Sequence, residues 1–321
     1  MLKYLIKRCI KAVPLLFIIS VICFLLMQAA PYDVVDALAS PDKPREVFEQ
    51  LREDYGLNEP LHIQYFRWMQ NILKGNLGNS LLNHSSIRDD LAARLPATIV
   101  LVLPAYLIAL VLSLFMGLWA AMHQGRWADR FIDGMCSVGL ATPSFWLALL
   151  FVYILGYRLK LFPLMGVHTI GLEDSLSDFL KHLFMPCMVL MLGFLPDLIR
   201  YVRVNAIRQM KEDYCTAQYA LGARSFEVLF LHVLPNILVP VITKVGMSLP
   251  ILVTGSVAVE TIFGWPGIGP YFMKAVQNID YPVVLVLLLL SSSLVILGNL
   301  FADVICCLID RRIVIQEGSG K

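Results

Sequence analysis

Six apolar runs, each long enough to cross a lipid bilayer, constrain this sequence more than any other feature. A helix rises 1.5 Å per residue, so about 20 residues cross a hydrocarbon core of about 30 Å. The chain is 58% hydrophobic and 16% charged, more apolar surface than one water-soluble core encloses. We therefore predict an all-α membrane protein with six transmembrane helices. The runs extend from about 10 to 30, 97 to 122, 131 to 156, 182 to 204, 237 to 262 and 281 to 309.

The basic residues of the connecting segments indicate which side of the membrane each segment faces. Lys and Arg accumulate in short cytoplasmic loops, whereas segments longer than about 60 residues escape this bias. The N-terminus, the 123–130 loop, the 200–235 segment and the C-terminus hold 14 basic residues. The two short connections on the other side hold 4. We therefore expect both termini to be cytoplasmic.

These sides divide the chain into parts with different environments. We expect residues 1–30 to form a cytoplasmic N-terminus and a retained first helix, and residues 311–321 to form a cytoplasmic tail. Residues 96–310 would hold spans two to six, with a cytoplasmic loop at 205–236 between the fourth and fifth spans. The remaining part, 31–95, is predicted to be an extracytoplasmic insertion.

The insertion carries a helical pattern of its own. Residues 47–55 and 61–72 place apolar side chains three or four positions apart, as Leu61, Tyr65 and Trp68 do. This spacing predicts two short amphipathic helices, the second ending near Gly75. A passive cap and a surface that docks a partner are both compatible with this pattern.

The cytoplasmic segment of residues 212–236, which we call the knob, combines two short helical stretches with a break at Gly222. Glycine is the natural hinge, because other residues lose about 1 kcal/mol or more in left-handed backbone. Pro235 is expected to stop the second stretch. An apolar face on such helices suits a groove on a soluble partner, although an interfacial loop without a partner would look similar. The apolar positions are Ala217, Ala220, Leu221, Phe226, Leu229, Phe230 and Val233.

The knob also carries a recognisable order of residues. Ala217, Ala220 and Gly222, followed by His232 to Asn236, resemble the EAA loop of binding-protein-dependent ABC importer permeases. The chain departs from that loop at Thr216 and Gln218, where the family has an acidic residue and a second alanine.

The resemblance extends over essentially the whole chain. The segments 57–81, 94–105 and 260–284 are similar, in the same order, to parts of the dipeptide, oligopeptide and nickel permease family. After the last span, this chain has Asp310, Arg311 and Arg312 where the family has Asp-Pro-Arg.

Membership of this family would imply a type I ABC importer permease fold in a bacterial inner membrane. The implied partners are a second homologous permease subunit, two ATP-binding subunits and an extracytoplasmic solute-binding protein. ATP and Mg would act on the partner subunits, since this chain has no Walker A sequence. We expect no catalytic residue, metal site or cofactor in this chain, and no nucleic-acid partner. The residues expected to couple to the ATP-binding subunits are Asp213, Ala217, Ala220, Gly222, Arg224, His232 and Pro235.

Polar residues within the apolar runs are the candidates for a transport path, because ionisable groups at bilayer depth are costly unless they face a cavity or a partner. Asp197 and Arg200 lie three positions apart and could pair on one helix face. For each charged residue, a structural pairing inside the protein is the alternative. The path candidates are Asp197, Ser248, Thr254, Ser256 and Glu260.

An ion-coupled secondary transporter of a small polar solute is the alternative function. Such proteins often show inverted repeats, and this chain shows none. The transported solute stays open: family members carry peptides, nickel complexes, glutathione and metallophores, and specificity resides largely in the binding protein.

Overall fold

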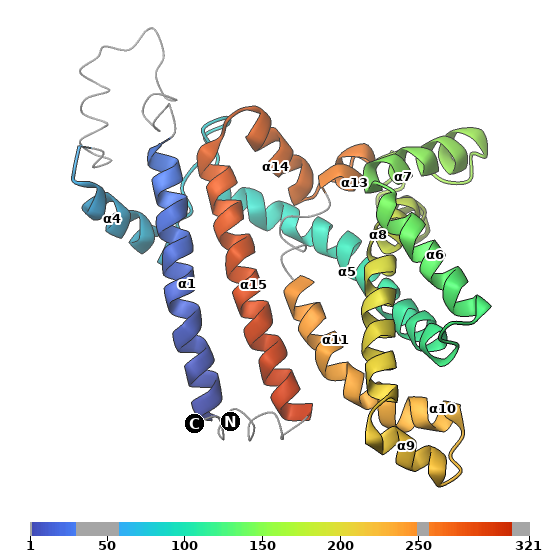
Figure 1. The fold of residues 1–321 in the computed structure, drawn as a ribbon. Coiled ribbons are helices and arrows are strands. Elements are labelled where there is room, and N and C mark those ends of the chain that lie inside the picture. The colour runs from blue at the N-terminus through green and yellow to red at the C-terminus, as the bar shows by residue number, and fades with distance from the viewer. Residues whose placement is uncertain (1, 30–57, 249–256, 310–321) are drawn as a thin grey trace.

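The computed structural model describes residues 2–29, 58–248 and 257–309, and helices dominate this part of the chain. The prediction of an all-α membrane protein is confirmed. In order, the elements are α1 (Leu2–Gln28), α4 (Leu61–Leu73), α5 (Ile87–Met122), α6 (Trp127–Ala141), α7 (Ser144–Phe151), the π-helix η1 (Val152–Arg158), α8 (Leu176–Met210), α9 (Asp213–Ala220), α10 (Ser225–Val228), the π-helix η2 (Leu229–Val233), α11 (Leu234–Ser248), α13 (Val257–Ile262), α14 (Ile268–Gln277) and α15 (Tyr281–Ile309) (Figure 1).

Four helical stretches in the described residues are long and apolar enough to cross a membrane: Ile87–Met122, Leu176–Met210, Ser225–Ser248 and Tyr281–Ala302. The bent pair of α6 with α7 and η1 makes a fifth candidate. Within α1, Ala12–Gln28 is a shorter apolar helix. The count of six spans therefore stays a prediction.

The third predicted span, 131–156, is wrong as a single straight helix. The chain bends by 94° between Trp127–Ala141 and Ser144–Arg158. Thr142 is extended, with ψ 116°, and Pro143 starts the next helix. The physical cause is the proline, whose ring disfavours helical backbone at the preceding residue.

Two other boundaries differ from the predicted ones. Helix α5 begins at Ile87, where the Ser86 hydroxyl caps it by accepting a bond from the Asp89 N–H. The predicted end of the insertion at residue 95 therefore falls inside a helix. The fifth run is α11 followed by α13, and the segment 249–256 between them lies outside the described residues, as do Thr254, Ser256 and the predicted helix at 47–55.

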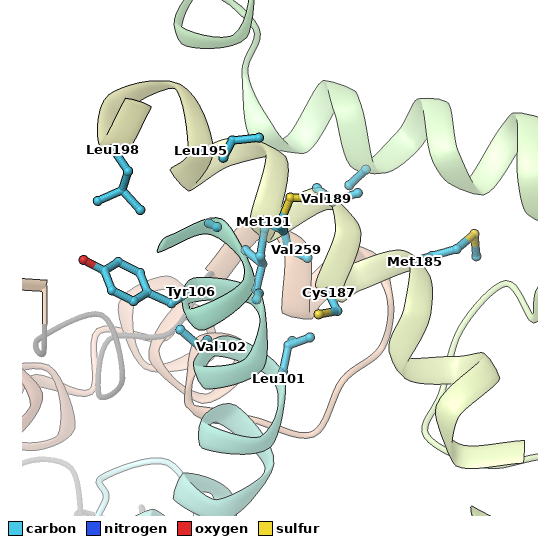
Figure 2. Packing of buried hydrophobic residues seen from close by; sticks show 14 of the residues in the cluster. Leu101, Val102, Tyr106, Met185, Cys187, Val189, Met191, Leu195, Leu198 and Val259 are labelled. Carbon is cyan, nitrogen blue, oxygen red and sulfur yellow. The ribbon is translucent and has the colours of Figure 1, made fainter. Parts of the chain in front are cut away.

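The core forms where α5 and α8 pack along each other (Figure 2). Tyr106 of α5 is almost completely buried, and its ring meets the edge of the Phe194 ring at 5.5 Å between centroids. Val259 of α13 joins the same cluster. Other members drawn in Figure 2 are Leu101, Val102, Met185, Cys187, Val189, Met191, Leu195 and Leu198.

A second layer consists of α1, α15 and α4. The predicted helix at 61–72 is confirmed as α4, and it packs on α1 through Tyr65, whose hydroxyl bonds the Ser20 hydroxyl at 2.8 Å. Gly75 follows this helix with φ +81°, the left-handed conformation that ends helices. The start of α1 and the end of α15 lie at the same end of the molecule as α9 and α10, and we call the opposite end the far end (Figure 1).

Candidate functional site

The turn of the knob is built around Gly222, as predicted. Its φ is +88°, and the N–H groups of Gly222 and Ala223 donate to the carbonyls of Tyr219 and Gln218 at 3.0 and 3.1 Å. These two bonds form a Schellman motif, which satisfies the last carbonyls of α9. No heavy atom lies within 4 Å of where a Gly222 Cβ would stand. The backbone conformation, and not crowding, therefore requires glycine here.

The second stretch of the knob does not stop at Pro235, and that prediction is wrong. Helix α10 continues through η2 directly into α11, with Pro235 as the second residue of α11. A proline ring collides with the carbonyl four residues earlier in a regular α-helix. The wider π-helical turn of η2 ends two residues before the proline, at Val233, and it accommodates the ring. The knob therefore joins α11 without a flexible break.

One face of the knob is anchored in the body of the protein. Cys215 of α9 is fully buried, and its Sγ lies 3.3 Å from the Gln209 carbonyl oxygen. Tyr214 donates its hydroxyl to Gln209 Oε1 at 2.7 Å, and burial raises the pKa of Tyr214 to about 12. The anchoring cluster comprises Leu118, Ala121, Val202, Ala206, Cys215, Val228, Leu229, Val233, Ile237 and Val241.

The other face of the knob is apolar and exposed. Leu221 is 80% exposed and Phe226 61% exposed, and Ala217 and Ala220 on α9 are exposed as well. Of the seven apolar positions predicted for the two stretches, Leu229 and Val233 belong to the buried anchor. Cys215 and Val228 also belong to the buried anchor, and neither was among the predicted apolar positions.

The charged and polar knob residues lie on the surface or near it. Asp213 stands exposed in the first turn of α9, where a negative charge favours the helix dipole. The backbone N–H of Arg224 donates to the Glu227 carboxylate at 2.9 Å, which closes the first turn of α10. His232 is half-buried, and its carbonyl accepts a bond from the Asn236 side chain at 2.8 Å.

Among the path candidates, Asp197 does not pair with Arg200, so that hypothesis is wrong. The Asp197 carboxylate contacts Lys244 Nζ of α11 at 2.8 Å. Arg200 turns toward α6, where it contacts Asp133 at 3.3 Å and the Ser137 hydroxyl at 2.6 Å. Residues three apart on a helix lie on neighbouring but not identical faces, and here each face meets a different helix.

Ser248 ends the described part of α11 next to the core. Its hydroxyl accepts a bond from the Tyr106 hydroxyl at 2.9 Å and donates to the Lys244 carbonyl at 3.0 Å. Ser248 thus lies one turn from Lys244, and its remaining neighbours are outside the described residues.

Glu260 is buried at the far end, where it holds a turn. Its side chain is fully buried, and Oε2 accepts a bond from the Gly269 N–H at 2.8 Å. The Thr98 hydroxyl of α5 lies 3.4 Å from the same oxygen and accepts a bond from the Ile268 N–H at 2.8 Å. A Cβ on Gly267 would stand 2.3 Å from Oε2. The Gly269 N–H and the Thr98 hydroxyl therefore both approach the same oxygen of this buried carboxylate.

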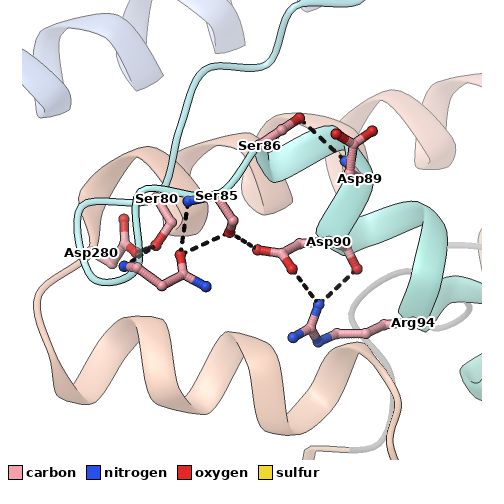
Figure 3. Close-up of polar contacts among 8 residues, drawn as sticks. Ser80, Ser85, Ser86, Asp89, Asp90, Arg94 and Asp280 are labelled. Atoms are coloured by element: carbon pink, nitrogen blue, oxygen red, sulfur yellow. Dashed lines mark hydrogen bonds and ion pairs between the residues drawn. The ribbon is translucent and has the colours of Figure 1, made fainter.

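A second polar network at the far end joins the end of the insertion to the start of α15 (Figure 3). The buried Asp280 carboxylate accepts bonds from the Ser80 hydroxyl at 2.5 Å and from the Leu81 N–H at 3.1 Å. In α5, Arg94 donates to Asp90 Oδ1 at 2.8 Å. The Asp280 contacts fix the segment at Ser80 and Leu81 against the start of α15, and the Arg94–Asp90 pair stabilises the first turns of α5.

Helices α6 and α8 are tied by a bidentate ion pair near the knob end. Arg203 contacts the two carboxylate oxygens of Asp129 at 2.5 and 2.8 Å, and the Gly125 N–H donates to Asp129 at 2.8 Å. The ion pair therefore fixes the start of α6 against α8. A groove of about 670 Å³ between the same helices is largely apolar, and its lining includes Gly134, Gly139 and Gly193.

Two family models match the chain. The model of the binding-protein-dependent transport system inner membrane component matches residues 113–315, and the model of its N-terminal part matches residues 1–102. The oligopeptide transport system permease protein AppB of Bacillus subtilis is 36% identical over 314 residues, covering 98% of this chain and 99% of AppB.

Other relatives match over the same length. A putative peptide permease protein of Brucella ovis is 32% identical, covering 98% of this chain and 99% of its own. The glutathione transport system permease protein GsiC of Escherichia coli K12 is 31% identical, with the same coverage of both chains.

Proposed function

Because the chain belongs to the family of binding-protein-dependent transport system inner membrane components, as a permease subunit without an ATPase site, we propose that it forms half of a peptide import path. The second half would come from a homologous permease, and two ATP-binding subunits would carry ATP and Mg. A solute-binding protein would deliver the peptide. Nickel or metallophore complexes are a second cargo class, supported only by the sequence resemblance.

The observation that carries this proposal is the exposed apolar face of the knob. Leu221 and Phe226 are large apolar side chains on a structure whose opposite face is already packed. A soluble partner with an apolar groove would cover them, as amphipathic helices are covered in helix-in-groove complexes. We assign that groove to an ATP-binding subunit, with Asp213 and Arg224 at its rim.

The attachment of the knob explains how it would transmit movement. Helix α8 enters the knob and α11 leaves it, and the π-helical run of η2 makes the exit continuous. The Asp197–Lys244 contact joins the same two helices farther along. Closure of the ATP-binding subunits would therefore move α8 and α11 together as a rigid body.

We propose that the solute-binding protein docks on the far end. The knob and both termini would then lie on the opposite, cytoplasmic side of the membrane. The support is the charge distribution of the loops and the fixed network around Asp280 and Ser80. The path would run along Asp197 and Ser248, with Thr254 and Ser256 beyond them, and without the buried Glu260.

Purification from the native membrane tests the proposal. We expect a second permease and ATP-binding subunits to accompany this chain, and peptide uptake to require ATP. An ion-coupled secondary transporter, the alternative function, would be recovered as a lone monomer or homodimer whose uptake follows an ion gradient. That result would overturn the proposal.

A further inference from the structure

The ion pair between Asp197 and Lys244 lies inside the membrane-crossing part of the protein. Asp197 is 13 residues from the end of α8 at Met210, a distance of about 20 Å along a helix. Lys244 lies one turn before Ser248, the last residue of α11, and Asp197 Oδ2 and Lys244 Nζ are 2.8 Å apart. The pair therefore lies well away from the knob surface.

The pair is open on one side. The side chain of Asp197 is 56% exposed and that of Lys244 29% exposed. The exposed side chains of α1, by contrast, are large and apolar, such as Val13 and Phe17. An exposed carboxylate at this depth is costly against lipid, so we assign this side of α8 to a water-filled cavity along the path.

Aromatic and hydroxyl side chains lie near the pair. Lys244 Nζ lies 5.6 Å from the centre of the Tyr201 ring, and the hydroxyls of Tyr106 and Ser248 bond each other one turn along α11. Each charged group still has capacity beyond its partner: the carboxylate has a second oxygen, and the ammonium has three N–H donors.

We infer that the Asp197–Lys244 pair recognises the two charged ends of a peptide as it passes through the chain. Asp197 accepts the terminal ammonium, and Lys244 donates to the terminal carboxylate. The pair is electrically neutral before and after the peptide leaves, so neither end is held by an uncompensated charge. Conduction needs such weak, reversible contact. This inference rests on the proposed function and names the chemical class that its path selects.

Chemical labelling tests the location independently of transport. In the assembled complex, Asp197→Cys should react with a charged, membrane-impermeant thiol reagent, and the dipeptide Ala-Ala should slow the reaction in the presence of ATP and binding protein. The control Phe17→Cys, equally exposed on the apolar face of α1, should not react. Failure of Asp197→Cys to react in any state would overturn the inference.

Uptake ratios test the recognition. For Ala-Ala and for its N-acetyl derivative, the uptake rate of the variant is divided by that of the wild type. Preferences of the binding protein affect both rates equally and therefore cancel in this ratio. Asp197→Asn should lower Ala-Ala uptake roughly ten-fold and leave the acetylated peptide nearly unchanged, as expected for one lost charged hydrogen bond. Lys244→Gln should likewise lower the uptake of Ala-Ala, and it should leave the uptake of Ala-Ala amide, which lacks the terminal carboxylate, nearly unchanged.

A double variant separates recognition from a structural tie. If the pair only joins α8 to α11, Asp197→Asn with Lys244→Gln removes both charges and should recover uptake relative to either single change, equally for all peptides. Recognition predicts that the double variant is at least as impaired as the singles toward Ala-Ala. Recovery would overturn the inference. If wild type takes up no peptide of any kind while Asp197→Cys is labelled, the proposed function fails instead.

Discussion

The two glycine turns at opposite ends of the molecule need glycine for opposite reasons. At the knob, Gly222 has φ +88°, and no heavy atom lies within 4 Å of the position that its Cβ would take. At the far end, Gly267 has an ordinary φ of −93°, yet its Cβ would stand 2.3 Å from Glu260 Oε2 and 2.4 Å from Thr98 Oγ1. Backbone conformation constrains the first turn, and surrounding atoms constrain the second.

This difference separates a surface that can meet a partner from one that holds the protein together. The apolar side chains beside the knob turn are exposed. In the far-end turn, the backbone passes close to the buried Glu260 carboxylate and donates a hydrogen bond to it. The contrast predicts which substitutions each turn tolerates. Substitutions at four positions test it.

The largest effect is expected at Gly267. Gly267→Ala forces a methyl group into the Glu260 carboxylate and Thr98, and overpacking of this kind costs about 3 kcal/mol. Thermal unfolding of the purified complex in detergent measures the loss. As a matched control, Gly134→Ala adds a methyl group to α6 where no heavy atom lies within 4 Å, and it should not lower the Tm. Equal shifts for the two variants would contradict the steric explanation.

A smaller loss is expected when the carboxylate itself is changed. Glu260→Gln weakens the charged bond to the Gly269 N–H and turns an amide group toward Thr98, at a cost of about 2 kcal/mol. Uptake per folded complex should stay close to wild type, because Glu260 holds the turn. A variant with normal Tm and abolished uptake would instead return Glu260 to the transport path.

At Gly222 the expected cost in stability is only about 1 kcal/mol, from left-handed backbone in a side-chain-bearing residue. Gly222→Val should nevertheless uncouple ATP hydrolysis from uptake, because it reshapes the turn beneath Leu221. Gly222→Asn is the control, since asparagine tolerates this conformation, and it should retain coupling. Asparagine at Gly267, where space is lacking, should not be tolerated; tolerance there would erase the contrast.

Several elements of this arrangement could be predicted from the sequence. The sixth run matches α15 from Tyr281 to Ile309, and the spacing of Leu61, Tyr65 and Trp68 predicted α4. Gly222 was predicted correctly because left-handed backbone is a local requirement that one residue type satisfies.

What failed depends on contacts between distant residues. Neither the choice of Lys244 by Asp197 nor the burial of Glu260 beside Thr98 can be derived from spacing along one helix, since each partner lies on another element. The bend at Thr142 and Pro143 did have a local signal, but a long apolar run on both sides masked it. The apolar face of the knob was split between an anchor and an exposed patch for the same reason.

The smallest effect on stability is expected at Leu221. Leu221→Ser removes an exposed side chain and should change the Tm very little, because no buried contact is lost. It should weaken retention of the ATP-binding subunits during purification. Val228→Ser in the buried anchor is the opposite control, and it should lower the Tm.

Proximity labelling from the knob tests the central claim most directly. A photoreactive maleimide attached to Leu221→Cys in the assembled complex is illuminated, and its crosslinked partner is identified by mass spectrometry, with Phe17→Cys on α1 as the reference position. The account predicts a crosslink from Leu221→Cys to an ATP-binding subunit and none from Phe17→Cys. Crosslinks from Leu221→Cys to lipid or solvent alone, in a complex that still hydrolyses ATP, would contradict it.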